Sequence, residues 1–416
     1  MMNMKAAVLT GLLATTLTGA AFAQQGPVPR GVPHLDHVWV IMMENHSYSQ
    51  ILNNPNAPFT NQYAKSANLA TNYFAVAHPS LTNYLETVGG SNFGVQDDNS
   101  PDWHNATCLT NLASTPNFES SGNAICPIAG TGTDAATPAI DYTNEAPGNA
   151  TINIDGTRSY DANSNTVGMT IADQLVAAGK SWKSYQESLP LQGADGVNNS
   201  DGFFTDKTDF SLINPQLNPP LSQGDLVELY AVKHNPFVYF QSVQEDKGAN
   251  GLRNTVAFEG DNGLYGDLSS GRVPTYSFIA PNQCNDQHGR GNGGAFCNFD
   301  PASDGSQSGL NPALILKGDQ TIQRVVTAIH GSPAWKRGRN VIVLLWDEND
   351  YSLAPNVNQV MTVVDTNNGP HHRTSGKYYN HFSLLKMIEG GLGVGCLNHA
   401  CDASTKTMTD LFATEE

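Results

Sequence analysis

Two oxygen-rich residue pairs are the side chains of this chain best suited to chemistry. Each pair directly follows an apolar run of strand length: Glu44 and Asn45 after 37–43, Asp347 and Glu348 after 341–346. Carboxylate and amide oxygens are hard ligands that suit divalent cations. In an open α/β sheet, ligands bind at the carboxyl ends of strands, where these residues are expected. The sequence therefore predicts one metal site shared by two strand ends that are far apart in the chain.

A serine at the expected start of a helix is the next candidate. Ser80 follows His78 and Pro79 and precedes the apolar pattern of 80–89. As an N-cap it would bind the free N–H groups of the first helical turn, which is the ordinary structural role of serine there. The same position suits chemistry, because a helix N-terminus stabilises a tetrahedral phosphate. The residues alone leave both roles open.

The elements that must position these residues alternate between strands and helices. Continuous apolar runs, typical of strands covered on both faces, predict four strands at 37–43, 237–243, 275–280 and 341–346. Helical patterns predict four helices at 80–89, 170–182, 319–336 and 381–390. Asp319 is expected to cap the third of these helices. The alternation predicts an α/β fold, a doubly wound, mainly parallel central sheet with helices on both faces.

A polar stretch interrupts this pattern. Between about 92 and 168, Asn, Thr, Ser, Gly, Pro and Asp dominate and apolar periodicity disappears. Such a stretch is either disordered or a loop-rich cap, and the Cys108/Cys126 pair favours the cap. We therefore expect a cap inserted into a single domain at 35–416, which follows an N-terminal linker at 24–34. Two further polar loops are expected at 193–225 and 284–312.

The six cysteines form three close pairs along the chain: Cys108/Cys126, Cys284/Cys297 and Cys396/Cys401. An even number of cysteines in an exported chain favours disulfides over a metal cluster, and no C-x-x-C occurs. Pairing between neighbours is the simplest connectivity, so we expect three local disulfides. The first of them would staple the polar cap.

The N-terminus has the pattern of a secretory signal peptide over residues 1–23. Lys5 supplies the positive start, a small apolar segment follows, and Ala21-Phe22-Ala23 matches a small-x-small cleavage site. The apolar run is too short and too rich in Thr and Gly for a transmembrane anchor. We therefore expect a periplasmic or secreted protein, cleaved near Ala23.

The net charge of the chain limits the classes of molecule that it is expected to bind. The chain has 21 Lys and Arg against 38 Asp and Glu, a net charge of −17. Such a field repels nucleic acids and anionic membrane surfaces, which argues against either as the main partner and against stable membrane insertion. It would also repel a phosphorylated substrate unless a metal ion and local histidines reverse the potential at the site. The oligomeric state stays open.

Several short motifs, in this order along the chain, resemble those of the acid phosphatase and phospholipase C phosphoesterase family: 43–48, 78–84, 278–288, 346–350 and 380–389. That family belongs to the alkaline-phosphatase-like superfamily. The resemblance extends from about residue 35 to about residue 392 and is weakest in the polar cap. It implies an alkaline-phosphatase-like fold and a small phosphorylated substrate, which includes the head group of a phospholipid.

The resemblance also implies residue roles. It makes Glu44, Asn45, Asp347 and Glu348 ligands of one divalent metal ion and Ser80 the nucleophile. A serine hydroxyl is a poor nucleophile near neutral pH, and coordination to the same metal lowers its pKa and neutralises phosphate charge. An oxygen-only ligand set suits Mg²⁺, Ca²⁺ or Mn²⁺ better than Zn²⁺. The alternative for the acidic residues is a solvated turn after a strand.

Histidines are the remaining candidates for catalysis. His78 and His288 are predicted to contact the phosphate or to protonate the leaving oxygen, because imidazole changes charge in the useful pH range. The alternative is that both are loop histidines whose hydrogen bonds are satisfied within the protein. His381 begins a helix and is expected to be structural or to act from behind the site. The roles of His371 and His372 stay open.

One departure from the family pattern concerns the segment after Asp350. Relatives commonly continue with Gly-Gly and Tyr-Asp-His, whereas this chain continues Tyr351-Ser-Leu-Ala-Pro355. A histidine that would join the site there is missing. The departure bears on substrate preference and not on the metal ligands.

Three functions compete on this evidence. The leading hypothesis is an exported metal-dependent acid phosphatase that hydrolyses phosphate monoesters through a phosphoserine. The second is a phospholipase C-type phosphodiesterase acting on phospholipid head groups. The third is a non-catalytic secreted binding protein that uses the polar cap as its working surface. G-x-S-x-G and H-E-x-x-H are absent, which disfavours an α/β-hydrolase nucleophile and a zinc protease.

Overall fold

The computed structural model describes residues 26–95, 97–101, 125–132, 140–141, 151–152, 166–189, 229–289, 312–349 and 358–412. The predicted signal peptide, most of the predicted polar cap, the loop at 193–225 and most of the loop at 284–312 lie outside the described residues.

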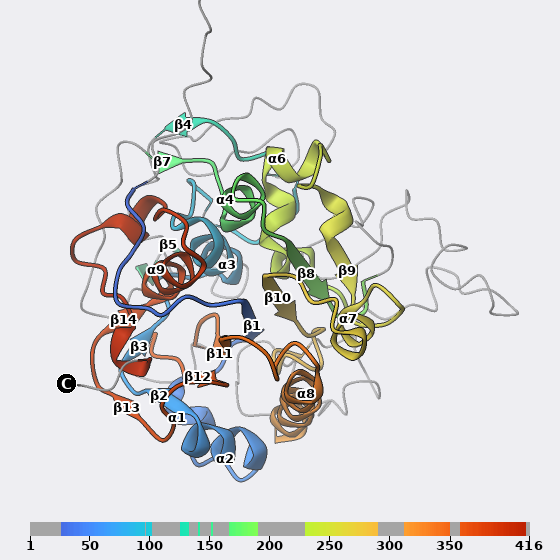
Figure 1. Ribbon diagram of the computed structural model, residues 1–416. Coiled ribbons are helices and arrows are strands. Elements are labelled where there is room, and N and C mark those ends of the chain that lie inside the picture. Colours follow the sequence, from blue (N-terminus) through green and yellow to red (C-terminus); the bar gives the residue numbers. More distant parts are fainter. Residues whose placement is uncertain are drawn as a thin grey trace, which may run out of the picture.

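An eight-stranded sheet forms the centre of the molecule (Figure 1). Its strands, in spatial order, are β13 (Thr374–Ser375), β2 (Asn68–Ala70), β12 (Thr362–Thr366), β11 (Asn340–Trp346), β1 (His37–Met43), β10 (Tyr276–Ala280), β8 (Trp182–Gln186) and β9 (Thr255–Ala257). Strand β12 is antiparallel to both of its neighbours, and every other neighbouring pair in this sheet is parallel. The predicted mainly parallel sheet is confirmed.

The two central strands are held in a register that matters for the site. β1 pairs with β11 in parallel from His37 opposite Asn340 to Met43 opposite Trp346. Every residue of β11, and every residue of β1 after the first, is buried. These strands are uniformly apolar because both of their faces are covered. The residues that follow Met43 and Trp346 therefore leave the sheet side by side.

Helices cover both faces of the sheet (Figure 1). One layer contains α3 (Ser80–Gly89), α4 (Ile171–Ala177) and α9 (His381–Leu392), and the other contains α2 (Pro58–Ser66), α7 (Leu264–Ser270) and α8 (Pro312–Gly331). The doubly wound α/β fold is thus confirmed. In the part of the chain that the structure describes, no helix is both long enough and apolar enough to cross a bilayer.

The remaining described elements are short. They are α1 (Tyr48–Ile51), α6 (Gln241–Gln244), the 3-10 helices η2 (Val232–His234), η3 (Pro236–Tyr239), η4 (Leu252–Asn254), η6 (Asn398–Cys401) and η7 (Thr409–Leu411), and the strand pairs β3 (Tyr73–Phe74) with β14 (Tyr379–Asn380), β4 (Thr131–Gly132) with β7 (Thr166–Val167), and β5 (Ile140–Asp141) with β6 (Thr151–Ile152).

Three predicted elements were wrong in type or extent. The helix predicted at 319–336 is α8, which begins at Pro312 and ends at Gly331. The segment 237–243 is not a strand but forms η3 and α6, since Pro236 starts a 3-10 turn. Its Phe237 ring packs on Trp182, Tyr276 and Phe278 of the sheet, although the segment does not pair with the strands. The predicted helix 170–182 ends at Ala177. Gly179 there has a φ of 70°, which stops the helix, and the chain enters β8 at Trp182.

The expected cap at Asp319 was also wrong. Helix α8 begins at Pro312, so Asp319 lies inside the helix. Its carboxylate instead accepts hydrogen bonds from the N–H groups of Phe59 at 3.1 Å and Thr60 at 2.7 Å. Asp319 therefore caps the first turn of the neighbouring helix α2, a contact between distant segments that local sequence spacing does not reveal.

One of the three expected disulfides is described in full. Cys396 and Cys401 are bonded, with their Cα atoms 5.2 Å apart. Cys126 and Cys284 are disulfide-bonded as well, whereas their expected partners lie outside the described residues.

Candidate active site

The two predicted oxygen-rich pairs meet at the carboxyl ends of β1 and β11. The N–H of Asp347 donates to the carbonyl of Met43 at 2.9 Å, which continues the pairing of the strands by one residue. The N–H of Asn45 then donates to Asp347 Oδ1 at 3.1 Å, and Asn45 has a φ of 51° that turns the chain sharply away from the sheet. Glu44, Asn45, Asp347 and Glu348 are all buried. The structure thus brings together side chains that are about 300 residues apart in sequence.

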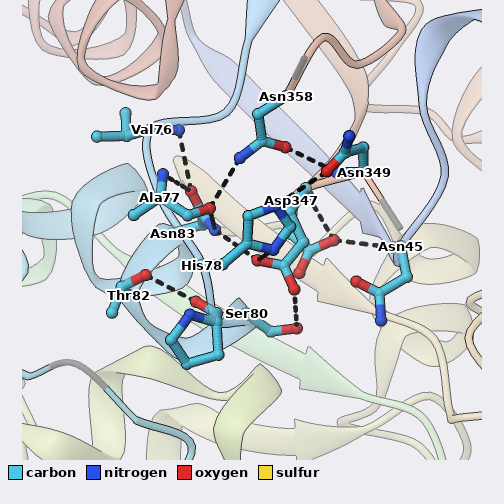
Figure 2. A network of polar contacts seen from close by, with 12 residues as sticks. Asn45, Val76, Ala77, His78, Ser80, Thr82, Asn83, Asp347, Asn349 and Asn358 are labelled. Carbon is cyan, nitrogen blue, oxygen red and sulfur yellow. Dashed lines mark hydrogen bonds and ion pairs between the residues drawn. The ribbon is translucent and has the colours of Figure 1, made fainter. Parts of the chain in front are cut away.

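Ser80 is the first residue of α3, and its side chain points toward the acidic residues at the strand ends (Figure 2). Its Oγ is 3.1 Å from Glu44 Oε2 and 3.1 Å from Glu348 Oε1, and its single proton can serve either carboxylate. The N-cap position belongs to Pro79, and no side chain of α3 caps its own first turn. The capping role considered for Ser80 is therefore not what the structure shows, because the hydroxyl faces the acidic residues.

Two further side chains fix Glu348 in place. Asn83 Nδ2 donates to Glu348 Oε2 at 3.0 Å, and His78 Nδ1 lies 2.9 Å from the same oxygen. The other end of each side chain is also engaged: Asn83 Oδ1 accepts the N–H groups of residues 76 and 77, and His78 Nε2 lies 2.9 Å from Asn349 Oδ1 (Figure 2). With both ring nitrogens held inside the protein, His78 fits the structural alternative better than a phosphate contact.

Glu44 is held by two residues to which sequence reasoning assigned no role. Tyr84, one turn after Ser80, donates to Glu44 Oε1 at 2.5 Å, and His234 Nε2 is 3.0 Å from the same oxygen. The two rings stack with centroids 5.1 Å apart and planes 10° from parallel. The polar triplet Lys233-His234-Asn235 inside an otherwise apolar stretch was the one signal that could have revealed His234.

The loop after β10 brings His288 to the same place. The carbonyl of Asp286 accepts the N–H of Glu44 at 2.9 Å, which docks the loop onto the end of β1. Asp286 Oδ1 accepts the N–H of His288 at 2.8 Å, and Asp286 Oδ2 is 3.6 Å from Nδ1 of His234. His288 Nδ1 lies 2.8 Å from the carbonyl of Gly289. That contact keeps a proton on Nδ1, so Nε2 is the ring nitrogen that can gain or lose one.

The electrostatics of the site favour a bound cation. Burial, followed by the charge of Asp347, raises the pKa of Glu44 well above its ordinary value. Burial and then Glu348 raise the pKa of Asp347, and burial and then Glu44 raise that of Asp286. Burial and mutual repulsion both disfavour the ionised form of these neighbouring carboxyl groups. A positive charge placed among them would therefore be stabilised.

The structure places His381, His371 and His372 in different surroundings. His381 Nε2 lies 2.6 Å from the carbonyl oxygen of Asp347, and its Nδ1 lies 3.1 Å from the hydroxyl of Tyr73. Burial lowers the pKa of His381 to about 4, so the ring is neutral and supports the backbone of Asp347 from behind. His371 and His372 are exposed and make their described contacts elsewhere.

Two buried oxygens test whether these residues fit a metal ion. Asn45 Oδ1 and Asp347 Oδ2 have no hydrogen-bond partner among the described residues, and buried polar atoms without a partner are rare. The described ranges contain no group of three or more His, Cys, Asp or Glu side chains arranged to hold an ion. The predicted set contains three carboxylates, those of Glu44, Asp347 and Glu348, and in this structure they are not arranged as such a cage. The observation that fits a cation is therefore the pair of orphaned oxygens on Asn45 and Asp347.

Comparison with known proteins decides the family. The model of the Phosphoesterase family matches residues 50–295, more than half of the chain. The chain belongs to this phosphoesterase family. It is therefore a hydrolase that acts on phosphoric ester bonds, which removes the non-catalytic binding protein from the competing functions.

Similar proteins carry phosphatase names. The chain is 24% identical to a phosphatidylinositol-3-phosphatase of Mycobacterium tuberculosis, over 98% of this chain and 94% of that protein. It is 25% identical to an acid phosphatase of Aspergillus fumigatus, over 60% of this chain but only 35% of that protein. Among solved structures, a protein of the alkaline phosphatase superfamily from Vibrio parahaemolyticus aligns over 93% of this chain and 76% of its own, at 9% identity and a TM-score of 0.46. The names of the curated relatives support phosphatase activity and a small phosphorylated substrate.

Proposed function

We propose that the protein is a metal-dependent phosphomonoesterase of acid phosphatase type in which Ser80 is the nucleophile. The observation that carries the proposal is the position of the Ser80 hydroxyl, 3.1 Å from carboxylate oxygens of both Glu44 and Glu348 at the start of α3. An isolated serine is a weak nucleophile, and this hydroxyl has carboxylate acceptors for its proton within hydrogen-bond distance.

The reaction follows from these contacts. Ser80 Oγ attacks phosphorus, the bond to the ester oxygen breaks, and the hydroxyl proton passes to a neighbouring carboxylate. His288, protonated on both ring nitrogens, gives its Nε2 proton to the departing alcohol oxygen, which leaves a phosphoserine. Water then gives a proton to His288 Nε2 as it attacks phosphorus, the carboxylate returns its proton to Ser80 Oγ as the P–O bond breaks, and inorganic phosphate is released. The loop contacts of Asp286 to Glu44 and His288 support this role, because they hold acid and nucleophile at one strand end.

The proposed cofactor is one divalent cation held by the oxygens of Glu44, Asn45, Asp347, Glu348 and Ser80. When bound, it would neutralise phosphate charge and lower the pKa of the serine hydroxyl. The orphaned oxygens of Asn45 and Asp347 support the proposal, and the oxygen-only set favours Mg²⁺, Ca²⁺ or Mn²⁺ over Zn²⁺.

The test measures phosphate or alcohol release from an aryl phosphate monoester and from the matching diester, with and without chelator. We expect hydrolysis of the monoester, its loss with chelator, and recovery when Mg²⁺, Ca²⁺ or Mn²⁺ is added back. Faster hydrolysis of the diester would replace this proposal with the phospholipase C-type phosphodiesterase. Undiminished activity in chelator would overturn the metal requirement.

A phosphoinositide monoester is the second candidate substrate. It is favoured by the relative named phosphatidylinositol-3-phosphatase, whose similarity extends over nearly the whole of both chains. Short-chain phosphatidylinositol 3-phosphate and a soluble sugar phosphate separate the possibilities. A kcat/KM at least tenfold higher for the lipid would assign the head group, and equal values would assign a broad phosphatase.

Export is the last part of the proposal. It is supported by the signal-like sequence of residues 1–23 and by the Cys396–Cys401 disulfide, since disulfides persist in oxidising compartments. N-terminal sequencing of protein recovered outside the cytoplasm should begin at Gln24. A chain that keeps its first residues and stays in the cytoplasm would contradict this.

A further inference from the structure

A buried lysine lies next to the site without a place in the reaction described above. Lys233 has an exposed fraction of only 2% and is the one buried lysine or arginine among the described residues. Its Nζ is 2.8 Å from Oδ2 of Asp98, a residue 135 positions away in the chain. An ammonium group is rarely buried unless it is paired, and the Asp98 carboxylate provides such a pairing.

The second oxygen of Asp98 reaches the nucleophile helix. Asp98 Oδ1 accepts the N–H of Leu81 at 3.0 Å, and Leu81 directly follows Ser80. This bond matters because Pro79 occupies the N-cap position of α3 and offers no side-chain cap. A single carboxylate thus joins the first turn of α3 to the buried Lys233 ammonium. The helix dipole also favours a negative group at this end.

Lys233 also acts on the acidic side of the site. It is adjacent in sequence to His234, which contacts Glu44 at 3.0 Å. Lys233 also lies close enough to Glu44 and Asp286 for its positive charge to interact with both carboxylates. In a chain of net charge −17, this is a buried positive charge placed close to the residues that would handle a phosphate.

We propose that Asp98 and Lys233 form a positioning pair for the nucleophile. Asp98 fixes the first turn of α3, and with it the backbone that carries Ser80, against the segment that carries Lys233 and His234. The inference rests on the proposed role of Ser80 and deepens it. The two residues act through α3 and Glu44, so neither is assigned a contact with the substrate.

Kinetics of Asp98 variants give the first test. Asp98→Ala removes both contacts and should lower kcat for an aryl phosphate by roughly a hundredfold while KM changes far less, since small misplacements of a nucleophile have effects of this size. Asp98→Asn keeps an acceptor for the Leu81 N–H and should recover part of that loss. A pure stabilising role would instead leave kcat of the folded protein unchanged in both variants, which would overturn the proposal.

A second ion pair provides the matched control. Lys183 Nζ lies 2.5 Å from Asp267 Oδ2, between β8 and α7 and away from Ser80. Lys183→Met should leave kcat unchanged, whereas Lys233→Met should lower it. The double variant Asp98→Ala/Lys233→Met should be no slower than the slower single variant. If the two residues act as a pair, either substitution already removes the effect of the pair, and the second adds no further loss of kcat. Effects that simply multiply would show that the two residues act separately.

An exchange measurement tests the pair without relying on activity. Amide hydrogen exchange in a peptide covering the first turn of α3 should become faster in Asp98→Ala, and the peptide covering the start of α9 should be unchanged. Unchanged exchange in α3 would overturn the proposal even if the enzyme is slow. If Ser80→Ala keeps normal turnover, the proposed nucleophile fails, yet the exchange result still decides whether Asp98 fixes α3. If Asp98→Ala does not fold, Asp98→Leu, which likewise lacks an acceptor for the Leu81 N–H, carries both measurements.

Discussion

The N-terminus of α3 differs from those of α4 and α9. In α4, the Thr170 side chain accepts the N–H of Ala172 at 3.1 Å and forms a capping box with Asp173. In α9, Asn380 accepts the N–H of Ser383 at 3.0 Å. Both helices therefore carry their own caps in the local sequence, as most helices do.

Helix α3 carries no cap of its own. Pro79 occupies the N-cap position, and the hydroxyl of Ser80 is turned toward Glu44 and Glu348. The free N–H of Leu81 is satisfied by Asp98, which lies outside the helix. The comparison shows two uses of a polar side chain at a helix start: it either caps the free backbone N–H groups of the helix or hydrogen-bonds to the residues of the active site. Where it serves the site, another segment must supply the cap.

The largest effect is expected from Ser80→Ala. Turnover should fall by more than about a thousandfold, because the nucleophile is removed. The free energy of unfolding should change by less than about 1 kcal/mol, because this hydroxyl caps nothing. Quenching turnover of the wild-type protein should trap phosphate on Ser80.

Ser383→Ala is the matched control, since Ser383 also lies in a first helical turn, with its Oγ 3.3 Å from Asn380 Oδ1. It should keep wild-type turnover. Near-normal rates in Ser80→Ala would mean that water attacks phosphorus directly and that the covalent mechanism is wrong.

Asp347→Asn should separate activity from stability. Loss of one carboxylate ligand should lower turnover by roughly a hundredfold or more. In the presence of chelator the variant should be more stable than the wild type, on the order of 1 kcal/mol, because one of the crowded buried charges is gone. Asn Oδ1 can still accept the N–H groups of Asn45 and Glu348, which keeps the turn intact. Chemical denaturation in chelator measures the difference, and a less stable variant would contradict the crowding argument.

Thr170→Ala should show what an ordinary cap does. It should cost about 1 kcal/mol of unfolding free energy and leave kcat unchanged. Denaturation curves and steady-state kinetics on the same preparation measure both. A kcat loss comparable to that of the Asp98 variants would erase the distinction between the two kinds of helix start.

The smallest effect concerns Asp410, a carboxylate outside the site. Burial would raise its pKa, but hydrogen bonds from Ser375 and Tyr379 and the nearby Lys377 outweigh burial and hold the pKa below its ordinary value. The folded state therefore favours the charged form. The contribution is present above the unfolded pKa and is lost as the pH falls through the folded one.

Asp410→Asn should accordingly lower stability at neutral pH by less than about 1 kcal/mol, since the group is partly exposed. The gap to the wild type should close in strong acid. Thermal midpoints of both proteins from pH 7 to pH 2 measure it. A gap that widens as the pH falls would show that the sign is wrong.

The sequence was most informative for features that depend on residues close together in the chain. Strands β1 and β11 were predicted because burial on both faces makes them continuously apolar, and the polar residues after them mark where they end. Strand β12 was missed, because Thr362–Thr366 is short and includes two threonines and an aspartate. The aromatic run that begins at Phe237 was misassigned, because apolar content does not tell a buried turn from a buried strand.

The supporting side chains of the site were harder to predict. Tyr84 and Asp286 lie within motifs that the sequence singled out, yet their roles depend on which distant side chain they meet. His234 and Asp98 lie outside those motifs and reach the site only through tertiary contacts. Spacing along the chain carries no record of such contacts, so sequence reasoning identified the candidate ligands and not the residues that hold them.

The register of β1 against β11 has a consequence for insertions and deletions. Because Met43 lies opposite Trp346, Glu44 and Asp347 emerge together. Side chains alternate between faces along a strand, so one residue added within either strand would send one acid to the wrong side and shift it by about 3.3 Å. Chain length inside these two strands is therefore fixed by the site. A library of single-residue insertions should lose activity throughout 38–43 and 341–346 while retaining it at many loop positions.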